Sequence, residues 1–228
     1  EMPNPALGDP AIDTADDYLA WMNHAVWAED ISAGQARQIR ARYYGSIEFV
    51  DHCVGRILDA VEQRADADNT LICFFSDHGD HLGDHRAWQK ESFFEASCRV
   101  PFLVSWPRKL PAGQRHQGLT ALTDLIGLVS AASGEPVLRE GHPLLANLRG
   151  EAASRESLIG MYGTPGTRLF KCMVRRDHWK YIWLANGGRE LLFDLATDPG
   201  ETRNACAAAP EIAARLRAEA ERALAIRE

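Results

Sequence analysis

A long amphipathic segment followed at once by a short, wholly apolar run constrains this chain most. Over residues 33–61, large apolar side chains recur at steps of three and four with Arg and Glu between them, which is typical of one long helix. Residues 66–69 are polar and break that period, and the run 71–75 then shows no polar alternation. Such a strand is usually covered on both faces, as in the parallel sheet of an α/β fold. The two segments together predict a helix–strand unit of an α/β domain.

The segments around this unit extend it. Residues 1–20 are rich in Pro, Asp and Ala without a clear period, which predicts a loop or an extended arm. A polar loop over residues 76–97 leads to a second apolar strand over 100–106. Further along, the pattern predicts a helix over 121–132 and a short strand around 158–162.

The last third of the sequence has a different pattern of apolar residues. Short apolar runs separated by Asn, Asp and Gly predict an antiparallel meander with strands at 172–175, 179–183 and 191–194. An Ala/Arg/Glu-rich helix is expected over 210–226. The fold class predicted is therefore α/β over residues 1–156, followed by a small antiparallel sheet plus helix over 157–228.

Composition narrows the classes of function. The chain has 228 residues and a net charge of −7, which argues against a nucleic-acid partner. No apolar run approaches the roughly 20 residues that span a bilayer, and no signal-peptide pattern opens the chain. Five cysteines without CxxC spacing predict free thiols in a reducing compartment, which favours the cytoplasm. An export signal upstream of Glu1 would instead indicate the periplasm or secretion, and that alternative stays open.

The loop after the apolar run carries the chemistry. Residues 76–85 read Ser-Asp-His-Gly-Asp-His-Leu-Gly-Asp-His, and ligands of open α/β sheets gather beyond the carboxyl ends of strands. Asp and neutral His bind divalent metals well, and Asp77 and His78 can share one ion if the chain turns at Gly79. The same residues also fit a solvated polar loop with a capping Asp. Two ligands are too few for a catalytic ion, which needs three or more from the protein.

Two cationic side chains come after residues 76–85 in the sequence. Lys90 could hold an anionic substrate oxygen or the charge that develops on a leaving group, although a surface charge fits it equally well. Arg99 lies one helical turn after Glu95 and is expected to pair with it.

Taken together, these residues resemble the C-terminal half of the sulfatase family, in the alkaline-phosphatase superfamily. Several ordered motifs at consistent spacing carry this resemblance from about residue 37 onward. They are Ser-Asp-His-Gly at 76–79, Leu-Gly-Asp-His at 82–85, Trp-x-Lys at 88–90, Phe-Phe-Glu at 93–95, Arg-Val-Pro at 99–101, Trp-Lys-Tyr-Ile at 179–182 and Asp-Pro-Gly-Glu at 198–201. The resemblance implies part of an alkaline-phosphatase-like sheet with flanking helices.

The resemblance also implies roles for single residues. Asp77 and His78 would bind the active-site cation, most commonly Ca²⁺, with Mg²⁺ or Mn²⁺ as alternatives. Lys90 would contact the sulfate group and the ester oxygen that departs, and His85 would support the site without being a ligand. The Asp-His pair also occurs in relatives that hydrolyse phosphonate monoesters and phosphodiesters, so it does not decide between sulfur and phosphorus.

The family's nucleophile is a formylglycine made from the Cys or Ser of a C/S-x-P-x-R motif, and this chain lacks it. After Cys98 the proline comes one position late, and after Ser105 a lysine, Lys109, stands where arginine is required. We therefore expect an inactive chain unless the missing N-terminal half or a companion chain supplies the nucleophile and the other ligands. The expected substrate is a small anionic ester. A non-catalytic binding module that keeps the fold, and a homo-oligomer, stay open.

Overall fold

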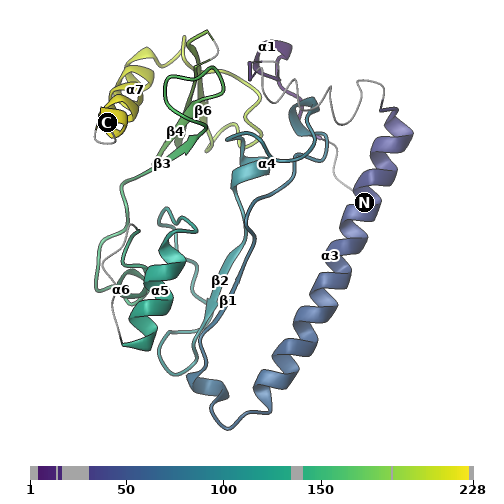
Figure 1. The fold of residues 1–228 in the computed structure, drawn as a ribbon, viewed down its shortest axis with the longest axis vertical. Coiled ribbons are helices and arrows are strands. Elements are labelled where there is room, and N and C mark those ends of the chain that lie inside the picture. Colours follow the sequence, from purple (N-terminus) through teal and green to yellow (C-terminus); the bar gives the residue numbers. More distant parts are fainter. Residues whose placement is uncertain (1–4, 14, 17–30, 135–140, 186, 226–228) are drawn as a thin grey trace. The chain divides into compact units, whose positions relative to one another are not determined.

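The computed structural model describes residues 5–13, 15, 16, 31–134, 141–185 and 187–225 (Figure 1). They form two compact units: residues 38–77 with 100–156, and residues 1–37 with 78–99 and 157–228. The second unit thus includes the N-terminal segment and the polar loop, which the sequence analysis assigned to the domain over 1–156. Among the described helices, none has the length and apolar character needed to cross a membrane.

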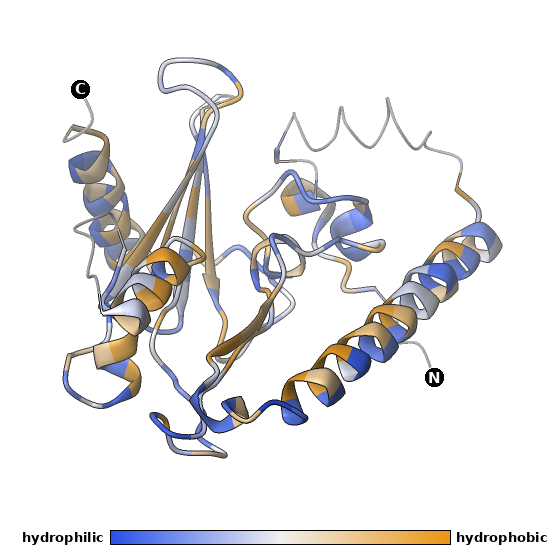
Figure 2. Ribbon diagram, turned by 60° about the horizontal axis from the view of Figure 1, so that its bottom comes forward, coloured by the Kyte–Doolittle hydropathy of each residue, from blue (hydrophilic) through white to orange (hydrophobic). Residues whose placement is uncertain are grey.

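The long predicted helix is present as α3 (Ala33–Glu62). None of its residues is buried, and apolar and polar patches alternate along it (Figure 2). The 3-10 helix η1 (Ala67–Asn69) then leads into strand β1 (Ile72–Phe75).

Strand β1 differs from the expectation of a doubly covered strand in a parallel sheet. It pairs antiparallel with β2 (Phe102–Ser105), with Ile72 opposite Ser105, and the two form a two-stranded sheet. Phe74 and Phe75 are 39% and 41% exposed. A wholly apolar run indicates which side chains avoid water; it carries no information about the direction of the neighbouring strand. The parallel arrangement was therefore a wrong inference for this pair.

A small core joins these strands to two helices. Helices α5 (Asp124–Ser133) and α6 (Leu144–Leu148) pack with β1 and β2 around Trp106, Leu128 and Leu144. The predicted helix is confirmed, but it begins at Asp124, three residues later than expected. The buried Asp124 carboxylate accepts a hydrogen bond from the backbone N–H of Ala121 at 2.8 Å, which fixes the preceding residues in a turn.

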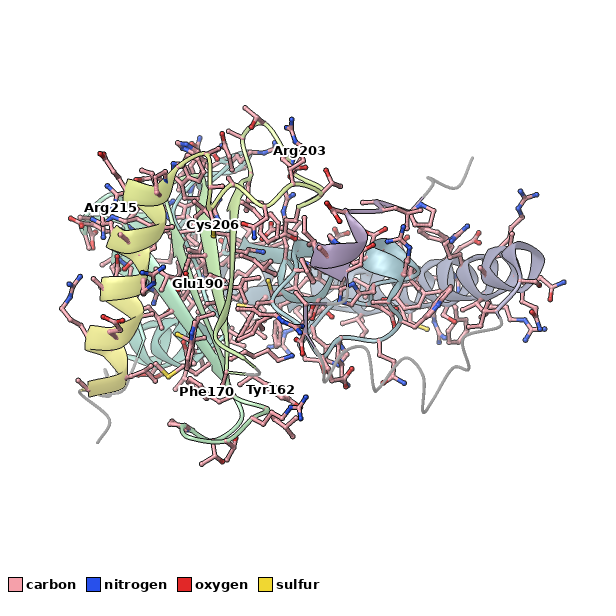
Figure 3. The ribbon with its side chains drawn as sticks, turned by 90° about the horizontal axis from the view of Figure 1, so that it is seen from above. Tyr162, Phe170, Glu190, Arg203, Cys206 and Arg215 are labelled. Carbon is pink, nitrogen blue, oxygen red and sulfur yellow. The ribbon has the colours of Figure 1, made fainter. Side chains whose placement is uncertain are left out.

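The predicted meander is confirmed. Strands β3 (Ser157–Tyr162), β4 (Lys171–Arg176), β5 (Trp179–Leu184) and β6 (Arg189–Asp194) pair in sequence order, each antiparallel to the next. The period of two along these strands gives the sheet two apolar faces. One face, with Val174, Tyr181 and Leu192, packs against helix α7 (Pro210–Ala225), which lies along the sheet (Figure 3).

The other face of this sheet buries the polar loop and part of the N-terminal segment. Met173, Ile182, Leu191 and Phe193 form one core with Phe94 and Ala87 of the loop and with Ile12 and Ala15. Three short helices lie here: α1 (Pro10–Asp13), η2 (Asp84–Arg86) and α4 (Glu95–Cys98). Residues 5–13, 15 and 16 of the predicted loop or extended arm are thus packed and not extended, and the rest of residues 1–20 lies outside the described residues. All five cysteines are free thiols, as predicted.

Candidate functional site

Asp77 and His78 follow β1 after a single residue, Ser76, as predicted. The Asp77 side chain is exposed and His78 is half-buried. His78 Nδ1 lies 2.8 Å from the carbonyl oxygen of Gly79. Since a carbonyl can only accept, Nδ1 carries the proton and Nε2 has the lone pair in the neutral ring. This is the tautomer in which a histidine binds a metal through Nε2 while its other nitrogen donates to a carbonyl.

Glycine is required at position 79 because the backbone of helix α4 lies very close to it. A Cβ atom at this position would lie 2.0 Å from the carbonyl oxygen of Ala96 in α4, and the Gly79 N–H donates to the Ser97 carbonyl at 2.7 Å. Its φ is not in the left-handed region, so the turn itself does not need glycine. The sequence analysis singled out Gly79, but the reason is its contact with α4.

The backbone of the loop is strained further on. Left-handed conformations at non-glycine residues cost roughly 1–2 kcal/mol each and cluster at functional sites. The loop contains four of them, at Leu82, His85, Arg86 and Gln89. Two loop-closing hydrogen bonds hold this geometry, from the His81 N–H to the Gln89 carbonyl at 2.8 Å and from the Gly83 N–H to the Ala87 carbonyl at 2.9 Å.

His85 and His81 point into the core and not toward solvent. His85 Nδ1 lies 3.0 Å from Asp13 Oδ1, and its ring stacks on Phe94 with centroids 3.9 Å apart. His81 Nε2 lies 2.7 Å from Ser92 Oγ. Burial lowers the pKa of His85, and burial with the neighbouring His85 lowers the pKa of His81 to about 3. Both rings are therefore neutral at pH 7, and the supporting role expected for His85 stays a prediction.

Sequence reasoning missed the partners that the N-terminal segment supplies. Asp13 and Asp16 are buried. Asp13 pairs with both His85 and Arg86, and Asp16 pairs with the buried Lys171, whose Nζ also donates to the Glu91 carbonyl at 2.5 Å. These pairs join residues 72 to 155 positions apart, and no local pattern signals them.

Lys90 is exposed at the far end of the loop. Within the part of the chain that the structure describes, its Nζ makes no hydrogen bond or ion pair, while its backbone N–H donates to Glu91 Oε2 at 3.1 Å. The ammonium group is thus available to an anion. Over the same described residues, no three His, Cys, Asp or Glu side chains gather as a metal site would require.

A buried ionic cluster anchors α4 to the meander. Lys180 Nζ lies 2.6 Å from Glu95 Oε1, 2.8 Å from Glu201 Oε1 and 2.9 Å from the Phe93 carbonyl. Glu201 Oε2 also accepts the Glu95 N–H at 2.5 Å. Burial raises the pKa of Glu201; for Lys180, burial opposes the charged form but the nearby carboxylates outweigh it and raise its pKa. Lys180 and Glu201 belong to motifs that sequence reasoning quoted without giving them a role. Arg99 lies 3.9 Å from Glu95, as expected.

Comparisons with known proteins cover nearly all of this chain. The family model described as Sulfatase matches residues 8–134, and the model described as N-sulphoglucosamine sulphohydrolase, C-terminal, matches residues 83–225. A choline-sulfatase of Rhizobium meliloti is 31% identical over 180 residues, 77% of this chain and 34% of the relative. An arylsulfatase of Clostridium perfringens is 29% identical over 210 residues, 90% of this chain and 43% of the relative.

A solved structure matches the whole chain. The phosphonate monoester hydrolase of Agrobacterium radiobacter superposes with a TM-score of 0.81 at 27% identity, covering 100% of this chain and 51% of that one. The chain therefore spans about half of this protein, and less than half of the two sulfatases.

Proposed function

The chain belongs to the sulfatase family, and we propose that it supplies two cation ligands, Asp77 and His78, and an anion-binding lysine, Lys90, to a metal-dependent hydrolase of sulfuric esters. The observation that carries the proposal is the loop itself. It begins with an Asp-His pair whose histidine has the ligating tautomer, and it presents a lysine whose ammonium has no partner among the described residues.

The donor set fits a divalent cation but is incomplete. An exposed carboxylate and a ring nitrogen suit Ca²⁺, Mg²⁺ or Mn²⁺, and we propose Ca²⁺. When bound, such an ion withdraws charge from an ester oxygen and attracts the anionic substrate. Asp77 and His78 would hold it together with ligands from another part of the enzyme.

Lys90 supplies positive charge of its own. Its three N–H donors can bind the oxygens of a sulfate group and the ester oxygen on which charge develops as the bond to sulfur breaks. An ammonium that is already paired would have to break that pair before binding. Lys90 avoids this cost, because no described group occupies its Nζ.

The nucleophile would come from a second polypeptide segment, the N-terminal half of the fold or a companion chain. Exposed apolar side chains on α3, Tyr43, Ile47, Val50 and Ile57, follow steps of four, three and seven and form one stripe. Such a stripe on a helix without buried residues is a surface suited to packing against that half. The chain alone would then have no turnover.

A phosphonate or phosphate ester is the second candidate substrate. The match to a phosphonate monoester hydrolase over the whole chain favours it, since the same cation and lysine would suit a phosphoryl oxygen. Turnover of 4-nitrophenyl sulfate and of 4-nitrophenyl phenylphosphonate by the completed enzyme separates the two.

The test starts from the DNA upstream of the codon for Glu1 and from neighbouring reading frames. A C/S-x-P-x-R segment there identifies the missing half, and the completed enzyme can be assayed. Asp77→Asn should then lower kcat/KM at least 100-fold and reduce the bound cation, and Lys90→Ala should lower it about 10²–10³-fold. Lys109→Ala, in the unit that does not contain Lys90, is the control for Lys90→Ala. Unchanged turnover with full cation content in Asp77→Asn would remove that residue from the site.

A further inference from the structure

Two separate parts of the polar loop over residues 76–97 form hydrogen bonds with one residue, Ser97. Its backbone carbonyl accepts the N–H of Gly79, next to His78, at 2.7 Å. Its hydroxyl donates to the carbonyl of Lys90 and lies 3.2 Å from the carbonyl of Ser92. Ser97 therefore connects the segment that carries a predicted ligand to the residue predicted to bind the anion.

Ser97 is itself held rigidly. It is buried in α4, and its N–H donates to the Phe94 carbonyl at 2.9 Å. The first residue of α4, Glu95, is fixed by Lys180 through an ion pair and by Glu201 through its backbone N–H. The hydroxyl is thus mounted on a short helix that the meander anchors.

Lys90 needs such an anchor more than most residues. Its side chain has no described partner, so the backbone alone determines where the ammonium group can reach. The preceding residue, Gln89, has a left-handed φ of 69°, a conformation that relaxes unless neighbouring bonds hold it. Without the Ser97 hydroxyl, the Lys90 carbonyl would keep one local bond, from the Ser92 N–H at 2.7 Å.

We propose that Ser97 is a positioning residue, which fixes the backbone of Lys90 relative to the His78 segment so that the lysine meets the substrate oxygen. The proposal rests on the proposed function, because it assigns Ser97 an effect only through Lys90. A shift of about 1 Å in a catalytic group can lower turnover about 100-fold.

The test compares single and double variants of the completed enzyme with 4-nitrophenyl sulfate. Ser97→Ala should lower kcat/KM about 10- to 100-fold in the parent, yet less than twofold when Lys90 is already alanine, because residues that act as one unit are not additive. Ser97→Ala should also increase the dependence of kcat on leaving-group pKa, as is expected of Lys90→Ala because its ammonium would stabilise charge on the departing oxygen. Ser97→Thr, which keeps the hydroxyl, should restore most of the activity.

Controls separate this effect from a loss of folding. Ser92→Ala removes another hydroxyl of the same loop, one that contacts His81 and the Phe94 N–H, and should not share the non-additivity with Lys90. If Ser97→Ala does not fold, Ser97→Cys replaces it, with its weaker donor, and should show the same pattern at smaller amplitude.

Two failures are distinguishable. If Ser97→Ala lowers kcat/KM equally in the parent and in Lys90→Ala, and Lys90→Ala is itself impaired, the positioning role is wrong while the proposed function stands. Unchanged turnover in Lys90→Ala would overturn the proposed function.

Discussion

Replacing Lys180 by methionine tests whether the buried ionic cluster holds the loop onto the meander. The ammonium is 1% exposed and serves two carboxylates and one carbonyl, and Glu201 beside it is also 1% exposed. Methionine keeps most of the aliphatic volume, so the cavity left behind is small. The loss is electrostatic: two carboxylates stay in place without their cation.

The magnitude follows from that burial. Removing one partner of a buried ion pair costs about 3–5 kcal/mol, because the remaining charge stays desolvated. Arg99→Met is the matched control, because Arg99 pairs with the same Glu95 at 3.9 Å but is 77% exposed. An exposed pair contributes about 0–1 kcal/mol, so the two variants should differ by about 3 kcal/mol.

Urea unfolding followed by tryptophan fluorescence and circular dichroism measures both free energies of unfolding. The deficit of Lys180→Met should also shrink as the pH falls from 7 toward 5. Burial raises the pKa of Glu201 above its unfolded value, so the folded variant takes up a proton first and loses its uncompensated charge. Equal free energies for Lys180→Met and Arg99→Met, at every pH, would refute the reasoning.

Three further predictions concern the same chain. Burial lowers the pKa of His81 to about 3, whereas the ring in the unfolded chain titrates near 6.5. The contribution of the neutral ring to the free energy of unfolding is therefore complete above pH 6.5 and is lost by about 1.4 kcal/mol per pH unit as the pH falls toward 3. Urea titrations at pH 7 and 5 should show a smaller pH dependence in His81→Phe. Gly79→Ala should destabilise by about 1–3 kcal/mol in thermal unfolding, since its Cβ meets Ala96, whereas Gly55→Ala on α3, with nothing within 4 Å, should stabilise slightly. Leu216→Ala should cost about 2–5 kcal/mol in urea unfolding, because this side chain is fully buried under the sheet, and a loss below 1 kcal/mol would contradict that packing.

Local periodicity was enough to predict most elements. The meander has strands of period two separated by turn residues, and α3 and α7 have helical periods, so each is determined by residues close in sequence. The direction of β1 against β2 depends on residues about 30 positions away and was inferred wrongly. The packing of residues 5–13, 15 and 16 depends on partners still further along the chain, and no pattern within that segment predicts it.

The candidate site was likewise predictable only in part. Asp77, His78 and Lys90 could be singled out because short motifs carry them, and His85 because it ends the Leu-Gly-Asp-His motif. What holds these residues could not be predicted: Asp13 against His85 and Lys180 against Glu201 are pairs formed by the tertiary fold. A motif indicates which side chains matter, but their partners follow only from the fold.

The meander packs against the loop that carries the proposed site, although none of its residues is predicted to touch substrate. Four left-handed residues cost the loop roughly 4–8 kcal/mol, so the loop needs neighbouring contacts to keep this geometry. Its own hydrogen bonds, the burial of Phe94 and Ala87 against the sheet and the Lys180 cluster together supply these contacts. A chain that kept the Asp-His motif and Lys90 but lost the meander would let the loop relax. We therefore expect substitutions on the inner face of the sheet to affect the proposed site.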